Sequence, residues 1–199
     1  KLKKNYKKEI GIKPLVKRLT KNKSFCSLIV GNGQNILFEK YAKDFSYNQP
    51  QTIMSITKMF ANLFVGELLK NKKINLNKNV SYYLPKIGSG YANAKVQDIL
   101  NMNVVNAYTE DYTKAYSSSF MHEPVGGWRL PKSGQIKLSQ EQYLNTIKNI
   151  KNRGLKNNSD YALYKSANTD VIGLIIEKIS GIPLRSEEHT SELQSQPDL

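Results

Sequence analysis

Ser55 and Lys58, in the stretch MSITKMF at positions 54–60, are the residues whose types and spacing could do covalent chemistry. A serine hydroxyl is a poor nucleophile until a nearby base takes its proton. Residues three apart share one helix face, so the lysine amine can reach the serine oxygen. Desolvation would lower the pKa of that amine and let it accept the proton. The spacing alone is common, however, and it equally fits a serine that opens an ordinary helix beside a surface lysine.

The sequence before and after Ser55 predicts the elements that must position it. Two β-prone apolar runs within 24–45 flank the turn sequence GNGQN, which predicts a β-hairpin. A helix is expected over about 55–71, because apolar residues recur there at spacings of three and four: Phe60, Leu63, Phe64 and Leu68. Residues 1–23 form a basic lead-in with one expected helix near 14–19.

The later part of the chain alternates expected helices with a long irregular region. A short helix is expected in KVQDILNM, and residues 103–137 are expected to be irregular and to form a functional loop. Ser139 and Gln142 have capping-box spacing and predict the start of another helix. The stretch from 159 to 168 is expected to be extended. A strongly apolar helix follows, with Asn168 as its N-cap and Gly181 as its C-cap.

The amino-acid composition narrows the classes of function that the protein can have. The net charge is +14, from 30 basic and 16 acidic residues, but 26 of the basic residues are lysines and the chain also holds 20 asparagines. This pattern indicates a compositional bias of the genome, and no nucleic-acid-binding motif accompanies it, so we expect no nucleic-acid partner. No run is long and apolar enough for a membrane span. The single Cys26 excludes an internal disulfide and is expected to be a buried structural thiol. One cysteine and two histidines are a poor ligand set for a closed zinc site, and we expect no metal.

The composition changes abruptly at Arg185. Lysine and asparagine are absent from residues 185–199, and the stretch RSEEHTSELQS resembles a common sequencing adapter translated in one frame. We therefore expect residues 185–199 to be a non-native tail. The alternative is a genuine acidic helical tail. If the tail is not native, His122 is the only native histidine, and any Ser-His-Asp triad would have to use it.

The sequence around Ser55 resembles the serine β-lactamase and penicillin-recognising superfamily. It is most similar to the class C-type branch that includes 6-aminohexanoate-dimer hydrolase. In that family the S-x-x-K helix precedes a G…L…G.I.LD..V..YLP pattern. Residues that fit it are Gly66, Leu69, Ile74, Leu76, Val80, Tyr83, Leu84 and Pro85, with Asn77 in place of the usual acid.

A second family element is a tyrosine with a polar residue two positions later. YKSANTDVIGLIIEKISG fits it, so the resemblance assigns proton relay to Tyr164 and the +2 position to Ser166, where class C β-lactamases carry Asn. Serine there is closer to the hydrolase branch. The segments YTEDY and GGW resemble a loop of the 6-aminohexanoate-dimer hydrolase-like members. Tyr112 and Trp128 in these segments are candidate substrate-binding residues, although ordinary loop packing is equally compatible with them.

The resemblance implies an α/β (α+β) fold, an antiparallel sheet plus a helical domain, over residues 24–184. It implies a serine hydrolase that cleaves a small-molecule amide or ester through an acyl-enzyme, with Ser55, Lys58 and Tyr164 as catalytic residues and no cofactor. The family's third motif, on a late strand, is absent, so we expect an incomplete and inactive fragment. The alternative function is a non-catalytic binding protein of the same fold. The resemblance also favours a bacterial cell envelope, and the oligomeric state stays open.

Overall fold

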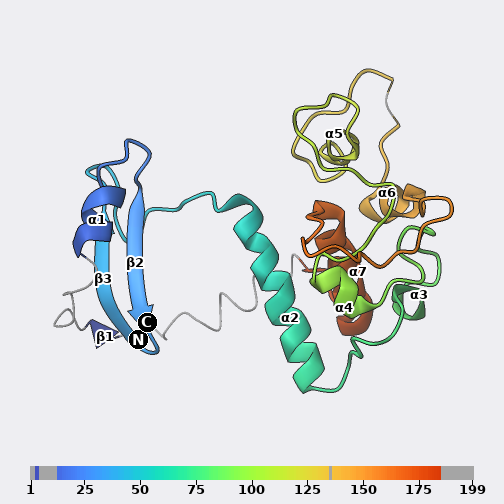
Figure 1. Ribbon diagram of the computed structural model, residues 1–199, viewed down its shortest axis with the longest axis horizontal. Coiled ribbons are helices and arrows are strands. Elements are labelled where there is room, and N and C mark those ends of the chain that lie inside the picture. The colour runs from blue at the N-terminus through green and yellow to red at the C-terminus, as the bar shows by residue number, and fades with distance from the viewer. Residues whose placement is uncertain (1–2, 5–12, 135, 185–199) are drawn as a thin grey trace. The chain divides into compact units, whose positions relative to one another are not determined.

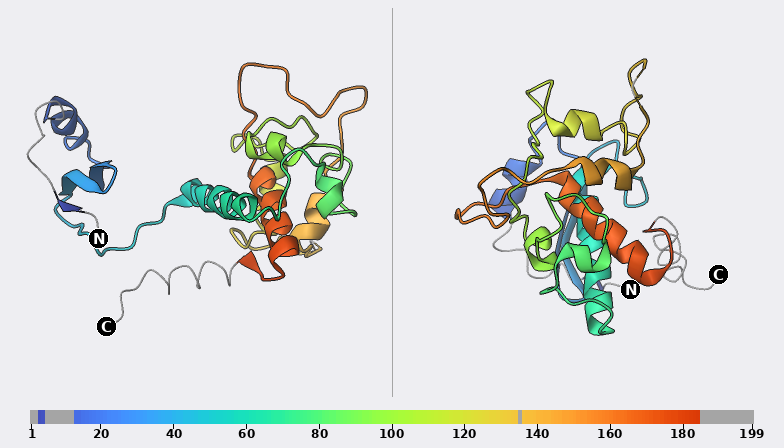
Figure 2. Two further views of the ribbon diagram at one scale, coloured as in Figure 1. Left: turned by 90° about the horizontal axis from the view of Figure 1, so that it is seen from below. Right: turned by 90° about the vertical axis from the view of Figure 1, so that its right-hand side faces the viewer.

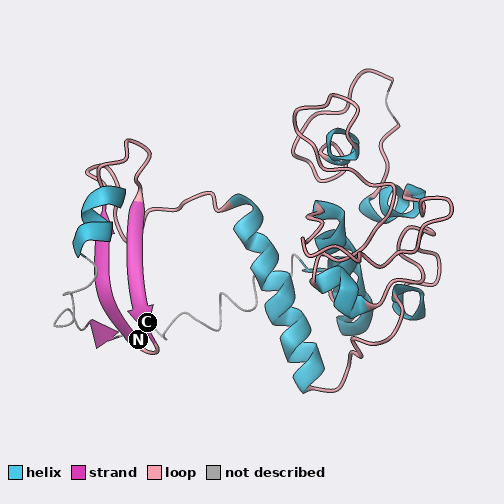
Figure 3. Cartoon of the chain, viewed as in Figure 1, coloured by secondary structure: helices cyan, strands magenta, loops and turns pink. Residues whose placement is uncertain are grey.

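The computed structural model describes residues 3–4, 13–134 and 136–184. The adapter-like segment 185–199 and much of the basic lead-in therefore lie outside the described residues. The chain divides into two compact units, Lys1–Met54 and Ser55–Leu199. All described strands lie in the first unit, and the second unit is built from helices and loops (Figures 1 and 3).

The first unit contains a three-stranded sheet and one helix. Its elements are β1 Lys3–Lys4, α1 Lys13–Leu19, β2 Ser27–Asn32 and β3 Asn35–Tyr41. The strand order is β1-β3-β2, with β2 antiparallel and β1 parallel to β3. The predicted hairpin and the predicted helix near 14–19 are confirmed. The two-residue strand β1 carries no apolar alternation and was not expected from the sequence.

Local geometry explains how the hairpin turns. Asn32 pairs with Asn35, so a two-residue connection joins the strands. Gly33 in this connection has φ 55°, a left-handed conformation that favours glycine. Val30 pairs with Phe38 and Gly31 with Ile36, which leaves one extra residue on β3 as a β-bulge.

The second unit holds the hydrophobic core. Its elements are η2 Met54–Thr57, which begins one residue before the unit, α2 Lys58–Lys70, α3 Val80–Tyr83, α4 Val96–Leu100, α5 Ser118–His122, α6 Gln140–Thr146 and α7 Ser166–Ser180. The main core cluster runs from Ala61 to Ile176 and lies entirely in this unit. Helix α7 contacts α2, α3, α4 and α6, and Figure 2 shows it, in red, among the other helices of the unit. The core is therefore organised around α7.

Helix α2 forms where its apolar periodicity predicts, but a different face is buried. Ala61 and Val65 are in the core, with Phe64 and Leu68 packed against it. Phe60 and Leu63 are 47% and 67% exposed. The apolar residues of α2 cover two adjacent faces, and contact with α7 selects the face that carries Ala61 and Val65.

Two helix ends follow their sequence signals. Ser139 Oγ accepts a hydrogen bond from Gln142 N, and the Gln142 side chain accepts one from Ser139 N, so the predicted capping box is confirmed. Gly181 ends α7 with φ 75°, which confirms the predicted C-cap.

Four expectations were wrong. Cys26 is only half-buried, and the stretch 159–168 is not extended throughout, because it is helical from Ser166 onward. The region 103–137 is not wholly irregular, because it contains the one-turn helix α5. Asn168 does not cap α7, which already begins at Ser166. Asn168 lies inside the helix, is fully buried, and its Oδ1 accepts a hydrogen bond from Tyr91 Oη over 3.0 Å. The buried Tyr91 hydroxyl needs a hydrogen-bond partner, and the Asn168 side chain fills this role inside the helix instead of capping its start.

No helix among the described residues is long and apolar enough to cross a membrane.

Changing either of two glycines in this unit to alanine should have opposite effects on the free energy of unfolding. A Cβ at Gly88 would lie 2.5 Å from Asn145 O and 2.6 Å from Ile147 O, so Gly88→Ala should lower the free energy of unfolding by about 1–3 kcal/mol. A Cβ at Gly66, inside α2, meets nothing within 4 Å. Gly66→Ala should therefore raise that free energy by about 0.5–1 kcal/mol. Urea denaturation of both variants checks this, and equal shifts for the two would contradict the close approach at Gly88.

Candidate functional site

Ser55 and Lys58 lie within hydrogen-bonding distance of each other. The Lys58 Nζ donates a hydrogen bond to Ser55 Oγ over 3.0 Å. Ser55 belongs to the 3₁₀ turn η2, and Lys58 is the first residue of α2. The i, i+3 spacing seen in the sequence therefore brings hydroxyl and amine together, as expected for one helical turn.

The chain reaches Ser55 through a residue with unusual backbone geometry. Met54 has φ 48°, in the left-handed region that residues with a side chain seldom adopt. Such conformations cost of the order of 1–3 kcal/mol and cluster at functional sites. The observation singles out the start of η2 as a constrained position directly before Ser55.

Tyr164 lies beside this pair. The Lys58 Nζ is 5.4 Å from the centroid of the Tyr164 ring. Burial by itself would raise the pKa of the Tyr164 phenol, but hydrogen bonds with Ser55 and Lys58 and the positive charge of Lys58 lower it overall. The ring is still 48% exposed. Three side chains from two distant segments thus form one accessible cluster.

Ser166 and Tyr112 meet at a carboxylate that the sequence did not single out, Glu110. Ser166 Oγ donates to Glu110 Oε1 over 2.7 Å, and Tyr112 Oη donates to the same oxygen over 2.6 Å. The backbone N–H of Ser166 donates to Glu110 Oε2. The hydrogen bond to Glu110 is the main reason why the pKa of Tyr112 is raised to about 12. The YTEDY segment is therefore tied directly to the first residue of α7.

Lys165, between Tyr164 and Ser166, is a buried lysine. Its Nζ donates to Asn106 Oδ1 over 2.6 Å and to Asn106 O over 3.3 Å. Only 6% of the residue is exposed. Burial, with a smaller contribution from the charge of Arg153, lowers the pKa of Lys165 to about 8. Asn106 is fixed in turn, because its Nδ2 donates to Gly90 O.

His122 belongs to a separate buried cluster. Its Nε2 lies 2.9 Å from Asp170 Oδ2, and its Nδ1 lies 3.1 Å from Tyr108 Oη. The ring stacks on Tyr143 with centroids 4.6 Å apart. Since a carboxylate only accepts, Nε2 carries the proton, and Nδ1 of a neutral ring accepts from Tyr108. Among the described residues no interaction joins His122 to Ser55, so the geometry offers no Ser-His-Asp triad.

Trp128 lies in a different part of the unit, beyond α5. It is 71% exposed, and its backbone N–H donates to Glu123 O. In the described part of the chain no hydrogen bond or ring contact joins Trp128 to Ser55, Lys58 or Tyr164. Its role in substrate binding stays a prediction.

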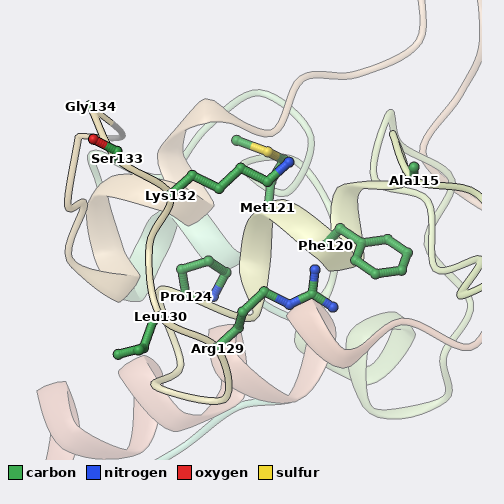
Figure 4. A pocket seen from close by; sticks show the side chains of 9 residues that line it. All are labelled: Ala115, Phe120, Met121, Pro124, Arg129, Leu130, Lys132, Ser133 and Gly134. Atoms are coloured by element: carbon green, nitrogen blue, oxygen red, sulfur yellow. The ribbon is translucent and has the colours of Figure 1, made fainter.

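A cavity of about 420 Å³ opens near α5 (Figure 4). It is lined by Ala115, Phe120, Met121, Pro124, Arg129, Leu130, Lys132, Ser133 and Gly134. The Arg129 guanidinium lies over the Phe120 ring and forms an ion pair with Glu123 over 2.8 Å. The cavity contains none of the residues of the Ser55 cluster.

Sequence reasoning missed Glu110, Asn106 and the burial of Lys165. Within the YTEDY segment, sequence reasoning singles out Tyr112 alone. A signal was present for Glu110, since an acid can satisfy the free N–H groups at a helix start. Nothing in the sequence, however, indicated that a residue 56 positions earlier would do so for α7.

The comparisons with known proteins agree with this arrangement. No protein-family model matches the chain. The chain is 30% identical over 157 residues to the 6-aminohexanoate-dimer hydrolase of Paenarthrobacter ureafaciens. This alignment covers 78% of the chain and 38% of the relative. The chain therefore spans well under half the length of that curated relative.

Two solved structures show the fold. A Bacillus anthracis protein described as a 6-aminohexanoate-dimer hydrolase matches 86% of this chain and 43% of its own length, with a TM-score of 0.64 and 16% identity. FmtA of Staphylococcus aureus matches 96% and 50%, with a TM-score of 0.53 and 18% identity. Both have the β-lactamase/transpeptidase-like fold. The chain thus resembles proteins of the β-lactamase and penicillin-binding-protein-like superfamily in sequence and in fold. The expected fold class is confirmed, and so is the expected resemblance to this superfamily.

The buried Lys165 predicts a pH dependence of stability. Its pKa falls from the ordinary 10.5 to about 8 on folding. Between these values the unfolded chain binds more protons than the folded chain, so stability rises with pH across this window. The slope that Lys165 contributes is at most about 1.4 kcal/mol per pH unit. Below about pH 8 the cost of burying the charge is fully present.

Denaturation at pH 7.5, 8.5 and 9.5 checks this prediction. Wild type should gain stability over this range relative to Lys165→Met, which cannot titrate at this position. The exposed Lys151 supplies the matched control, and Lys151→Met should keep the wild-type slope. Identical slopes for Lys165→Met and wild type would mean that Lys165 is not desolvated.

Proposed function

We propose that the protein carrying this chain is a serine hydrolase that cleaves a small-molecule amide or ester through an acyl-enzyme. The observation that carries the proposal is the 3.0 Å hydrogen bond between Lys58 Nζ and Ser55 Oγ, with the Tyr164 ring beside it. The hydrolase name of the Paenarthrobacter relative supports the reaction class. The chain spans 38% of that relative, so the activity proposed is that of the whole protein.

In the proposed first step, Ser55 Oγ attacks the carbonyl carbon of the substrate. The step requires the deprotonated form of Lys58, whose amine accepts the hydroxyl proton as the new C–O bond forms. The tetrahedral intermediate then expels the amine or alcohol, which takes this proton from Lys58 by way of Tyr164. The lowered pKa of Tyr164 supports this role, because a more acidic phenol gives up its proton more readily.

In the proposed second step, water attacks the acyl-enzyme and releases a carboxylic acid. Its proton returns through the same groups, which restores Ser55 and Lys58. No group other than the chain's own side chains is needed for this balance. Ser166, two residues after Tyr164, and Tyr112 are held together by Glu110, and both are proposed to contact the substrate.

Ser55→Ala tests the nucleophile. A fluorophosphonate probe, which reacts with activated serines, should label the wild-type protein and leave Ser55→Ala unlabelled. Ser24→Ala, an exposed serine in the first unit, is the matched control and should be labelled like wild type. Lys58→Met should slow labelling by about 100-fold or more, since it removes the base.

The same measurement separates the two functional classes. Equal labelling of wild type and Ser55→Ala would mean that another serine reacts and would refute the assignment. A wild-type protein that folds, stays unlabelled and still binds candidate substrates would indicate a non-catalytic binding protein of this superfamily.

A further inference from the structure

Glu110 takes no part in the chemical steps of the proposed mechanism. It lies in the loop before α5, it is half-buried, and it accepts three hydrogen bonds. Two of the donors belong to Ser166, and the third is the Tyr112 hydroxyl. A carboxylate that serves three donors is strongly fixed, because charge-assisted hydrogen bonds are stronger than neutral ones.

The contact is made at the N-terminal end of the longest helix. Ser166 is the first residue of the 15-residue helix α7, so its N–H has no partner within the helix. The partial positive charge of a helix N-terminus adds to the attraction of the carboxylate. Glu110 therefore fixes where α7 begins.

The start of α7 determines the position of Tyr164. Tyr164 precedes Ser166 by two residues, and Lys165 between them is held by Asn106. On the C-terminal side of Tyr164, the chain is thus attached to the segment 106–110 through the side-chain amine of Lys165 and through the backbone N–H and hydroxyl of Ser166. A tyrosine side chain has only two torsion angles, so its hydroxyl position follows closely from its backbone. Tyr164 is half-exposed beside Lys58. A hydrogen bond from Leu163 N to Met102 O holds the backbone before it, and the contacts of Lys165 and Ser166 hold the chain after it.

We propose that Glu110 is a positioning residue, whose carboxylate holds Ser166 and thereby orients Tyr164 relative to Ser55 and Lys58. This inference rests on the proposed serine hydrolase function. It states that Glu110 contributes to the rate through Tyr164 and makes no contact with the reacting atoms. Small displacements of a proton-transfer group can cost about 100-fold in rate.

Glu110→Gln tests the proposal. The amide keeps the size of the side chain but replaces one acceptor oxygen with a donor, so the three donors can no longer all be satisfied. The first-order rate constant of acylation by a saturating p-nitroanilide amide, whose leaving amine needs the proton that Tyr164 passes on, should fall by about 10- to 100-fold. The exposed Glu141 undergoes the same chemical change in Glu141→Gln, which should keep the wild-type rate constant.

The double variant with Tyr164→Phe separates positioning from stability. If Glu110 acts through Tyr164, Glu110→Gln should add less than about twofold to the loss already caused by Tyr164→Phe. A variant that only lowers the folded fraction would reduce the amplitude of p-nitroaniline release and leave its rate constant unchanged. Either a wild-type rate constant in Glu110→Gln or fully multiplicative losses in the double variant would overturn the proposal.

A failure of the proposed serine hydrolase function would give a different experimental result. If Ser55 is not the nucleophile, Ser55→Ala is labelled at the wild-type rate, whatever Glu110 does. Loss of labelling in Ser55→Ala together with a wild-type rate constant in Glu110→Gln would keep the hydrolase and remove only the positioning role.

Discussion

The burial of helix α7 is the constraint on which the rest of the second unit depends. Seven residues of this helix are buried, and four other helices contact it. The same helix begins two residues after Tyr164. The hydrophobic effect that drives α7 into the core therefore also brings the tyrosine segment toward α2, which carries Lys58. Chemistry at one end of the helix is supported by apolar packing along its length.

The candidate site combines one local and one long-range arrangement. Ser55 and Lys58 meet because they are three residues apart in helical structure, and this depends on little else. Tyr164 joins them only because the core has assembled. The polar contacts of Lys165 with Asn106 and of Ser166 with Glu110 then restrict the tyrosine segment further. Packing brings the segments close, and directional hydrogen bonds set the finer geometry.

Sequence reasoning succeeded where the cause of a structure is local. The hairpin turn needed a residue tolerant of positive φ, and Gly33 supplied it. The capping box needed only Ser139 and Gln142. The pairing of Ser55 with Lys58 followed from helical spacing. The fold class came from the resemblance of extended motifs, and this information is also local along the chain.

Sequence reasoning failed where the position of a side chain depends on a partner that is distant along the chain. Asn168 has the residue type of an N-cap, yet Tyr91, 77 residues earlier, takes its side chain into the core. Glu110 carries no signal of its partner Ser166. Phe60 and Leu63 fit an amphipathic pattern as well as Ala61 and Val65 do, and only contact with α7 determines which pair is buried. Such choices depend on tertiary packing, which composition and spacing do not contain.

The buried pair of Tyr91 and Asn168 has a consequence for the axial position of α7. A shift of the helix by one residue would rotate it by about 100° and would carry the Asn168 amide away from the Tyr91 hydroxyl into apolar surroundings. An apolar interface tolerates several such positions, but one internal amide makes all except one costly. The hydrogen bond therefore sets the rotation and axial position of α7. With them it sets the position of Tyr164, which lies two residues before the helix begins.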